Sequence, residues 1–230
     1  MLPKILLIFL LCSNLYSYGQ IYLGFTGDIG NRVEYSPRAE PFLKRPAAPS
    51  GSLSFFVQEN INDTWSLQYG GSAGTLGYWL KLQEFDTLST RRDPDFYSSY
   101  PNYNTIYTSA HLVFGRSISF KSSFPDLAIY LGGGFTYYFR SEVGSSAMVG
   151  SERIFDYEIS RLDEAVKGFM EISTQIHPVH WIMLGLRYRH HFQPALKGTY
   201  NLYHVENPPS GEVLVTQRTL SLLCFIKTHW

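Results

Sequence analysis

The sequence predicts an all-β chain: an eight-stranded antiparallel transmembrane β-barrel that follows a secretory signal peptide. Eight segments alternate apolar and polar residues with a period of two, which is typical of a sheet with two different faces. Short and long connections alternate between these segments, and three of the four tryptophans lie at one edge of the predicted sheet. Aromatic residues reach 16% while charged residues make up only 17%, a balance that favours strands and membrane interfaces.

The N-terminal residues have the three parts of a signal peptide. Lys4 supplies the positive charge, residues 5–12 (ILLIFLLC) form a short apolar stretch, and Ser17 and Gly19 are the small residues before a cleavage site. This stretch is too short for a spanning helix, which needs about 20 apolar residues. We therefore expect residues 1–19 to be removed, and residues 20–230 to form one barrel domain.

Cysteine usage and charge narrow the class of protein. After cleavage only Cys224 remains, so no intrachain disulfide can form. No later run of 18 apolar residues predicts a membrane helix, so an exported chain either stays soluble or crosses a membrane as strands. Without Lys4 the mature part has 18 basic and 19 acidic residues, which gives no sign of a nucleic-acid partner.

Eight predicted strands carry the alternating pattern. In the fifth, Leu127, Leu131 and Phe135 lie on the face opposite Tyr130 and Thr136. We expect the apolar faces to contact lipid and the polar faces to line the interior. The eight segments are 21–29, 52–58, 65–73, 105–114, 127–139, 166–176, 182–191 and 219–230.

The connections between these segments alternate in length. Only about five residues, 59–63, join the second and third segments, and about four, 177–180, join the sixth and seventh. The connections between the first and second, third and fourth, fifth and sixth, and seventh and eighth segments are much longer, and this alternation predicts short periplasmic turns and long extracellular loops. The expected loops are 30–49, 77–103, 141–164 and 193–211.

Tryptophans mark the periplasmic edge of the predicted barrel. Trp65 and Trp181 open the third and seventh segments, and Trp230 closes the eighth. Indole rings settle at the level of lipid headgroups, so we expect these three to form a periplasmic aromatic belt. A sheet in hydrocarbon cannot leave an edge unpaired, and eight strands enclose an interior that side chains fill. No pore for solutes is expected.

Four charged residues fall on the inward faces of the sixth and seventh segments. They are Lys167, Glu171, Arg187 and Arg189. Buried charges are retained only when paired, so we predict an internal charge network with a structural role.

Three segments carry a resemblance to a known family: QIYLGFTGDIG, LAIYLGGGFTYYF and the final LSLLCFIKTHW, whose alternating apolar residues end on an aromatic one. Through them the chain resembles the small outer-membrane barrels of the OmpX and OmpA-like type, and more narrowly a β-barrel family of Bacteroidota. This resemblance implies insertion into the outer membrane by the barrel-assembly machinery, beside outer-membrane lipid and lipopolysaccharide. PorT-like accessory proteins of type 9 secretion share this barrel type, although no motif selects them.

Catalytic and metal motifs are weak. Ser109 and His111 share one inward face, but their order is the reverse of the His-x-Ser arrangement in lipid A deacylases, so we expect a hydrogen-bonded pair. His177, His180 and residues 190–191 lack a Cys, Asp or Glu at a spacing that completes a tetrahedral metal site. The sequence predicts no cofactor, no metal and no catalytic residues.

The second expected loop is the best candidate for binding a partner, because exposed aromatic residues mixed with arginine are typical of contact surfaces. Its candidate residues are Arg91, Arg92, Phe96, Tyr97, Tyr100 and Tyr103. The alternative is that these residues extend the barrel wall above the membrane.

These observations favour a non-enzymatic outer-membrane barrel whose extracellular loops bind a partner protein or a surface ligand. Such a barrel can also be a subunit of a larger envelope or secretion complex. Two alternatives remain open: a lipid-modifying enzyme of the lipid A deacylase type, and a soluble periplasmic barrel that binds an apolar ligand.

Overall fold

The computed structural model describes residues 19–36, 43–44, 48–82, 99–119, 126–139, 142–149, 152–161, 165–203 and 210–228. No helix long and apolar enough to span a membrane occurs among these residues. The described residues form thirteen strands: β1 (Gln20–Ser36), β2 (Leu43–Lys44), β3 (Ala48–Asn60), β4 (Trp65–Leu82), β5 (Ser99–Ile118), β6 (Leu127–Tyr138), β7 (Glu142–Val149), β8 (Glu152–Arg161), β9 (Val166–Val179), β10 (Ile182–His191), β11 (Leu196–Leu202), β12 (Ser210–Thr216) and β13 (Arg218–Thr228).

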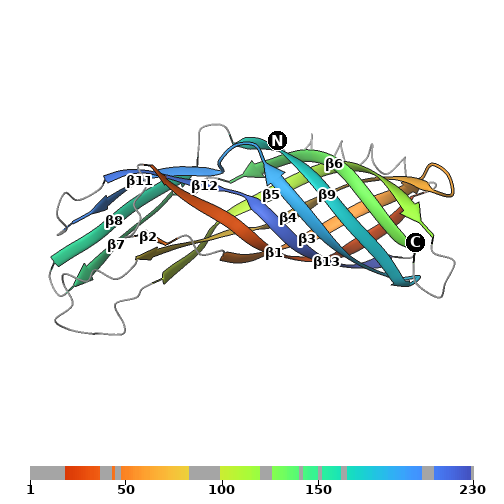
Figure 1. Cartoon of the computed structure of the whole chain (residues 1–230), viewed down its shortest axis with the longest axis horizontal. Coiled ribbons are helices and arrows are strands. Elements are labelled where there is room, and N and C mark those ends of the chain that lie inside the picture. The colour runs from red at the N-terminus through yellow and green to blue at the C-terminus, as the bar shows by residue number, and fades with distance from the viewer. Residues whose placement is uncertain are drawn as a thin grey trace, which may run out of the picture.

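Eight of these strands close into a barrel (Figure 1). They follow the order β1, β3, β4, β5, β6, β9, β10 and β13, and β13 pairs with β1 from Ile21–Thr228 to Ile29–Leu220. Each neighbouring pair is antiparallel. The predicted fold class, an eight-stranded antiparallel barrel, is confirmed.

The two faces of the barrel wall differ as the sequence predicts. Phe25, Leu131 and Leu222 point outward and are 60–70% exposed, whereas Gln68 and Ser221 are buried inside. This arrangement, apolar outside and polar inside, is that of a transmembrane β-barrel, because the outer wall must contact hydrocarbon. A soluble barrel that holds an apolar ligand would need the opposite facing.

Inside the wall, four glycines each pair across the strands with an aromatic residue. The pairs are Gly24 with Phe225, Gly70 with Phe56, Gly115 with Tyr130, and Gly134 with Phe169. A Cβ atom at any of these glycines would come within 2.8 Å of the paired aromatic residue. The narrow interior therefore accommodates large rings only because glycine lies opposite them.

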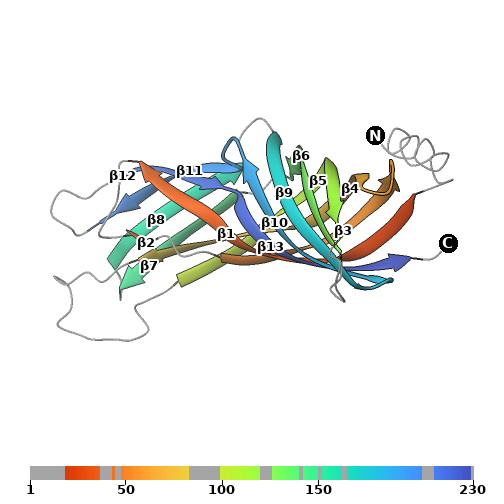
Figure 2. The same cartoon turned by 45° about the vertical axis from the view of Figure 1, so that its right-hand side comes forward.

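The ends of the barrel differ. β3 and β4 are joined by residues 61–64, and β9 and β10 by residues 180–181, so we name this the turn end. At the other end, β1 continues past the barrel and pairs with β12, and the sheet goes on through β11, β8 and β7 (Figure 2). We name β7, β8, β11 and β12 the extension.

Strands occupy part of all four expected loops. Residues 30–49 contain the end of β1, all of β2 and the start of β3. Residues 141–164 contain β7 and β8, and residues 193–211 contain β11 and the start of β12. The expected loop 77–103 is shortened from both sides, since β4 runs to Leu82 and β5 begins at Ser99. The physical reason is that the barrel wall supplies strand edges on which these segments can pair, which residue patterning alone does not reveal.

A bulge in β1 joins the barrel to the extension. Between Asp28 and Asn31, β1 has one more residue than its partner β3, and Gly30 has a φ of 106°. The extra residue reverses which positions point inward. Asp28 is buried on the barrel side of the bulge, and Val33 is buried on the side of the extension. The interior changes from polar to apolar at this point.

The extension has its own apolar core. Tyr200 is fully buried there, and burial raises the pKa of its phenol. The outer surface of the same strands is polar, with Lys197 and Glu212 forming an exposed ion pair at 2.5 Å. The buried apolar residues of the extension and of the adjoining part of β1 are Val33, Tyr157, Ile159, Leu196, Tyr200, Leu202, Val213 and Val215.

Candidate functional site

A chain of polar contacts crosses the barrel interior from β10 to β4. Arg189 donates two hydrogen bonds to Oε2 of Glu171, from Nη2 at 2.7 Å and from Nε at 3.1 Å. Its Nη1 donates to the Ser109 hydroxyl at 3.3 Å, and Ser109 bonds Ser72 at 2.6 Å. The guanidinium also lies 4.1 Å from the ring centre of Phe169. Arg189 is thus the central residue of a buried network.

Arg187 lies nearby with a looser partner. Its Nη2 is 3.8 Å from Oδ1 of Asp28, whose other oxygen accepts a 3.4 Å hydrogen bond from Tyr107. Lys167 is also buried. The structure thus brings Glu171 and Arg189 into direct contact, and it pairs Arg187 with Asp28, which the sequence reasoning did not include. Asp28 falls in the inward series of β1 and could have been found from that position.

Nearer the turn end, two amides close the interior. Gln68 and Gln175 exchange hydrogen bonds of 2.8 and 3.0 Å between β4 and β9, and Tyr130 bonds Ser66 at 2.8 Å. A cluster of buried apolar side chains lies beside this layer. It consists of Tyr22, Phe56, Met183, Leu223 and Phe225. The lumen is therefore occupied by side chains at successive levels.

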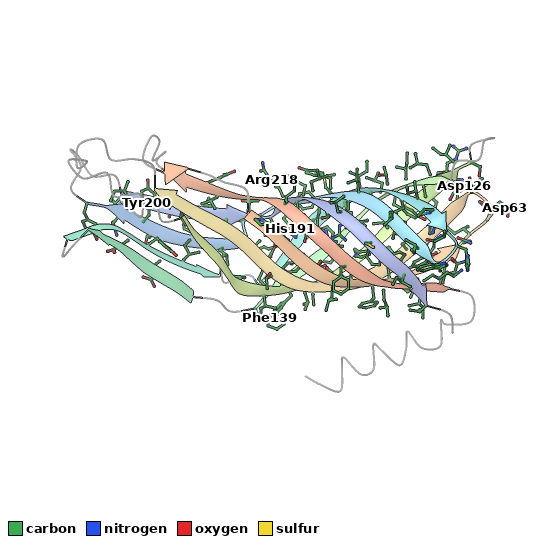
Figure 3. The ribbon with its side chains drawn as sticks, turned by 90° about the horizontal axis from the view of Figure 1, so that it is seen from below. Asp63, Asp126, Phe139, His191, Tyr200 and Arg218 are labelled. Carbon is green, nitrogen blue, oxygen red and sulfur yellow. The ribbon has the colours of Figure 1, made fainter. Side chains whose placement is uncertain are left out.

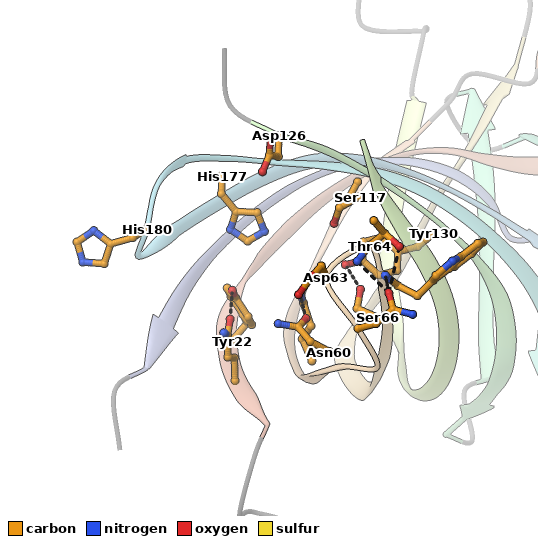
Figure 4. A pocket seen from close by; sticks show the side chains of 15 residues that line it. Tyr22, Asn60, Asp63, Thr64, Ser66, Ser117, Asp126, Tyr130, His177 and His180 are labelled. Carbon is orange, nitrogen blue, oxygen red and sulfur yellow. Dashed lines mark hydrogen bonds between the residues drawn. The ribbon is translucent and has the colours of Figure 1, made fainter. Parts of the chain in front are cut away.

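A polar bowl of about 670 Å³ opens at the turn end (Figure 4). Amides, hydroxyls and acids line it, and His177 and His180 stand on one side of it near Asp126. Figure 3 places Asp63 and Asp126 at this end of the molecule and Tyr200 at the opposite end. Among the described residues, no group of three or more His, Cys, Asp or Glu side chains could hold a metal ion.

Ser109 and His111 both point inward on β5 and are buried. Ser109 forms hydrogen bonds with Ser72 and Arg189. The Nδ1 atom of His111 has no hydrogen-bond partner among the described residues. Within the described part of the chain, no hydrogen bond links the serine to the histidine as a nucleophile is linked to its base. Both residues lie inside the barrel as expected, but the expected hydrogen bond between them is not formed in the described part of the chain.

Two of the three predicted belt tryptophans lie in the described part of the chain, both at the turn end. Trp65 stacks on Phe114 with ring centres 4.8 Å apart, and Arg116 lies over the same indole at 5.6 Å. Trp181 is exposed in the turn between β9 and β10. Trp230 lies outside the described residues.

The candidate binding residues of the second loop are only partly described. Tyr100 and Tyr103 belong to β5, which makes their segment part of the extended wall. The remaining candidates lie outside the described residues: Arg91, Arg92, Phe96 and Tyr97.

The surface that sequence reasoning missed is the outer face of the extension. On this face Thr199 of β11 lies between Glu158 of β8 and Glu212 of β12 as direct cross-strand neighbours, and all three are exposed. The alternation of buried Tyr157 and Ile159 with exposed Glu158 could have predicted β8.

The fold and interior define a class of protein, the outer-membrane type of small β-barrel. Among solved structures, OprG of Pseudomonas aeruginosa is similar, with 9% identity, a TM-score of 0.46 and coverage of 93% of this chain and 97% of OprG. Ail, the attachment invasion locus protein of Yersinia pestis, has 11% identity, a TM-score of 0.42 and coverage of 91% and 97%. Neisserial surface protein A has 12% identity, a TM-score of 0.39 and coverage of 90% and 97%.

No protein-family model matches this sequence, and no curated protein matches it significantly. These three structural similarities have identities of 9–12% and TM-scores below 0.5, and they do not extend to function. The narrower resemblance to Bacteroidota barrels and PorT-like proteins stays a prediction.

Proposed function

We propose that this chain is a non-enzymatic outer-membrane barrel that acts through its extension, by binding a partner protein or a surface ligand. The observation that supports this proposal is the contrast between the barrel and the extension. The barrel interior is filled by buried side chains, which include paired polar groups and an apolar cluster, whereas the extension is a folded sheet with a polar, exposed outer face. A rigid scaffold that presents such a face is a common arrangement for binding.

The orientation in the membrane is part of this proposal. Short turns lie on the periplasmic side in outer-membrane barrels, so the turn end would face the periplasm and the extension the cell exterior. Residues 1–19 would direct export. The barrel can act alone or as a subunit of a larger envelope or secretion complex.

Site-specific photocrosslinking tests the binding surface. A photoreactive amino acid at Thr199 or Asn201, both exposed on β11, should form crosslinks to a defined partner in intact cells. The same group at Asn62, in the turn between β3 and β4, is the matched control on the opposite end. Crosslinks from Asn62 alone, or from none of the three positions in correctly inserted protein, would contradict the proposal.

The lipid-modifying alternative is tested separately. Mass spectra of lipid A should be identical in cells with and without this chain. A difference in acylation that disappears with Ser109→Ala would favour the enzyme and would overturn the non-enzymatic assignment.

A further inference from the structure

Four inward polar residues form a continuous row on four adjacent strands of the barrel. Asp28 of β1 is paired with Ser221 of β13, Ser221 with Arg187 of β10, and Arg187 with Ser173 of β9. All four side chains are at least 96% buried. Direct cross-strand neighbours have Cβ atoms about 5 Å apart, so these side chains share one region of the interior.

The polar atoms of this row do not form hydrogen bonds with one another. The ion pair between Arg187 Nη2 and Asp28 Oδ1 spans 3.8 Å, which is too long for a hydrogen bond. Within the described part of the chain, four buried atoms of the row have no hydrogen-bond partner. They are Asp28 Oδ1, Ser221 Oγ, Arg187 Nε and Ser173 Oγ.

The donor and acceptor chemistry of these four atoms indicates which bound species could form hydrogen bonds with them. Arg187 Nε can only donate a hydrogen bond, Asp28 Oδ1 accepts one, and each serine hydroxyl can do both. The row itself holds one carboxylate and one guanidinium, so a bound anion would meet Asp28 and a bound cation would meet Arg187. Water both donates and accepts, and buried water characteristically bonds such groups.

We propose that the row is a binding site for ordered water, which bridges Asp28 to Arg187 and is held by the hydroxyls of Ser221 and Ser173. A polar contact longer than about 3.5 Å is too long for a direct hydrogen bond and leaves its two groups open to a shared water beside it. The bridge keeps both charges solvated without opening the lumen to bulk water.

The surroundings make this site a closed one. Towards the turn end, Leu223 and Phe225 follow Ser221 on β13 and belong to the buried apolar cluster. Towards the extension, Tyr138 donates a hydrogen bond to Gln217, and both side chains are buried. The water site is therefore internal to the barrel and is distinct from the bowl at the turn end.

A crystal structure of the whole barrel, at a resolution that shows ordered waters, tests the proposal directly. Density within hydrogen-bond distance of both Ser221 Oγ and Arg187 Nε is the expected result. Crystals grown in bromide distinguish the occupant: an anomalous peak at this position would identify an anion and overturn the water assignment. A direct hydrogen bond between Arg187 and Asp28, with no density beside Ser221, would also overturn it.

Two substitutions at Ser221 give an independent readout. Ser221→Ala leaves room for the water, whereas Ser221→Val fills the space and leaves Arg187 Nε and Asp28 Oδ1 unbonded. The urea midpoint of unfolding in detergent should fall further for valine than for alanine. In the valine structure the density beside residue 221 should also be absent. An equal or higher midpoint for valine would contradict a bound water at this position.

Discussion

Glu171→Gln removes the only carboxylate that contacts Arg189 among the described residues. Arg189 is 1% exposed and Glu171 4%, and the pair is held by two hydrogen bonds to one carboxylate oxygen. Removing one partner of a buried ion pair costs about 3–5 kcal/mol, because the remaining charge stays buried without compensation. Glutamine keeps an acceptor oxygen at the same position, so we expect a loss near the lower value, about 3 kcal/mol.

The measurement is the free energy of unfolding from urea titrations of the barrel in detergent micelles. The double variant Glu171→Gln with Arg189→Met should recover much of the loss, since it leaves no unpaired charge. Lys197→Gln is the matched control, because it breaks an ion pair that is 44% and 51% exposed in the extension and should cost at most about 1 kcal/mol. If Glu171→Gln costs no more than Lys197→Gln, the network does not stabilise the barrel.

Three further changes probe the wall and the bulge. Leu131→Arg, at a position 60% exposed on the outer wall, should reduce membrane insertion by about 2–4 kcal/mol if it lies near the midplane, while wild-type levels of folded protein in membranes would show that the face does not contact lipid. Gly134→Val should prevent folding, because even a Cβ atom would lie 2.0 Å from the carbonyl oxygen of Ala110, and an unchanged heat-modifiable band on gels would refute this. Gly30→Ala should lower the urea midpoint, since a residue with a side chain is strained at a φ of 106°; an unchanged midpoint would mean that the bulge relaxes.

The barrel itself could be predicted because its signal is local. Alternation in segments such as 127–139 assigns each residue to one of two faces, and the wall of a membrane barrel has lipid on one side and a narrow polar interior on the other. Gly134 could also be placed on the inward face. Its partner Phe169, 35 positions later in the chain, follows only from strand register.

The candidate site was less predictable because it depends on register across several strands. The alternating pattern places Glu171 and Arg189 inside but does not say which charges meet. The register puts Arg189 opposite Glu171 and Arg187 opposite Ser173 and Ser221. Asp28 joins them from β1, since β13 closes the sheet between β1 and β10.

The sequence by itself determined the strand periodicity, the facing of the wall and the short turns at one end, since each depends on neighbouring residues and on the solvent that they meet. Only the tertiary structure decided that the segments after Phe139 and after Gln193 fold as an extension of β1. Their pairing uses the edge that β1 offers beyond its bulge at Gly30, and the bulge reverses the inward positions so that Val33 enters an apolar core. A strand edge and a change of register arise from partners distant in sequence, so no local pattern encodes them.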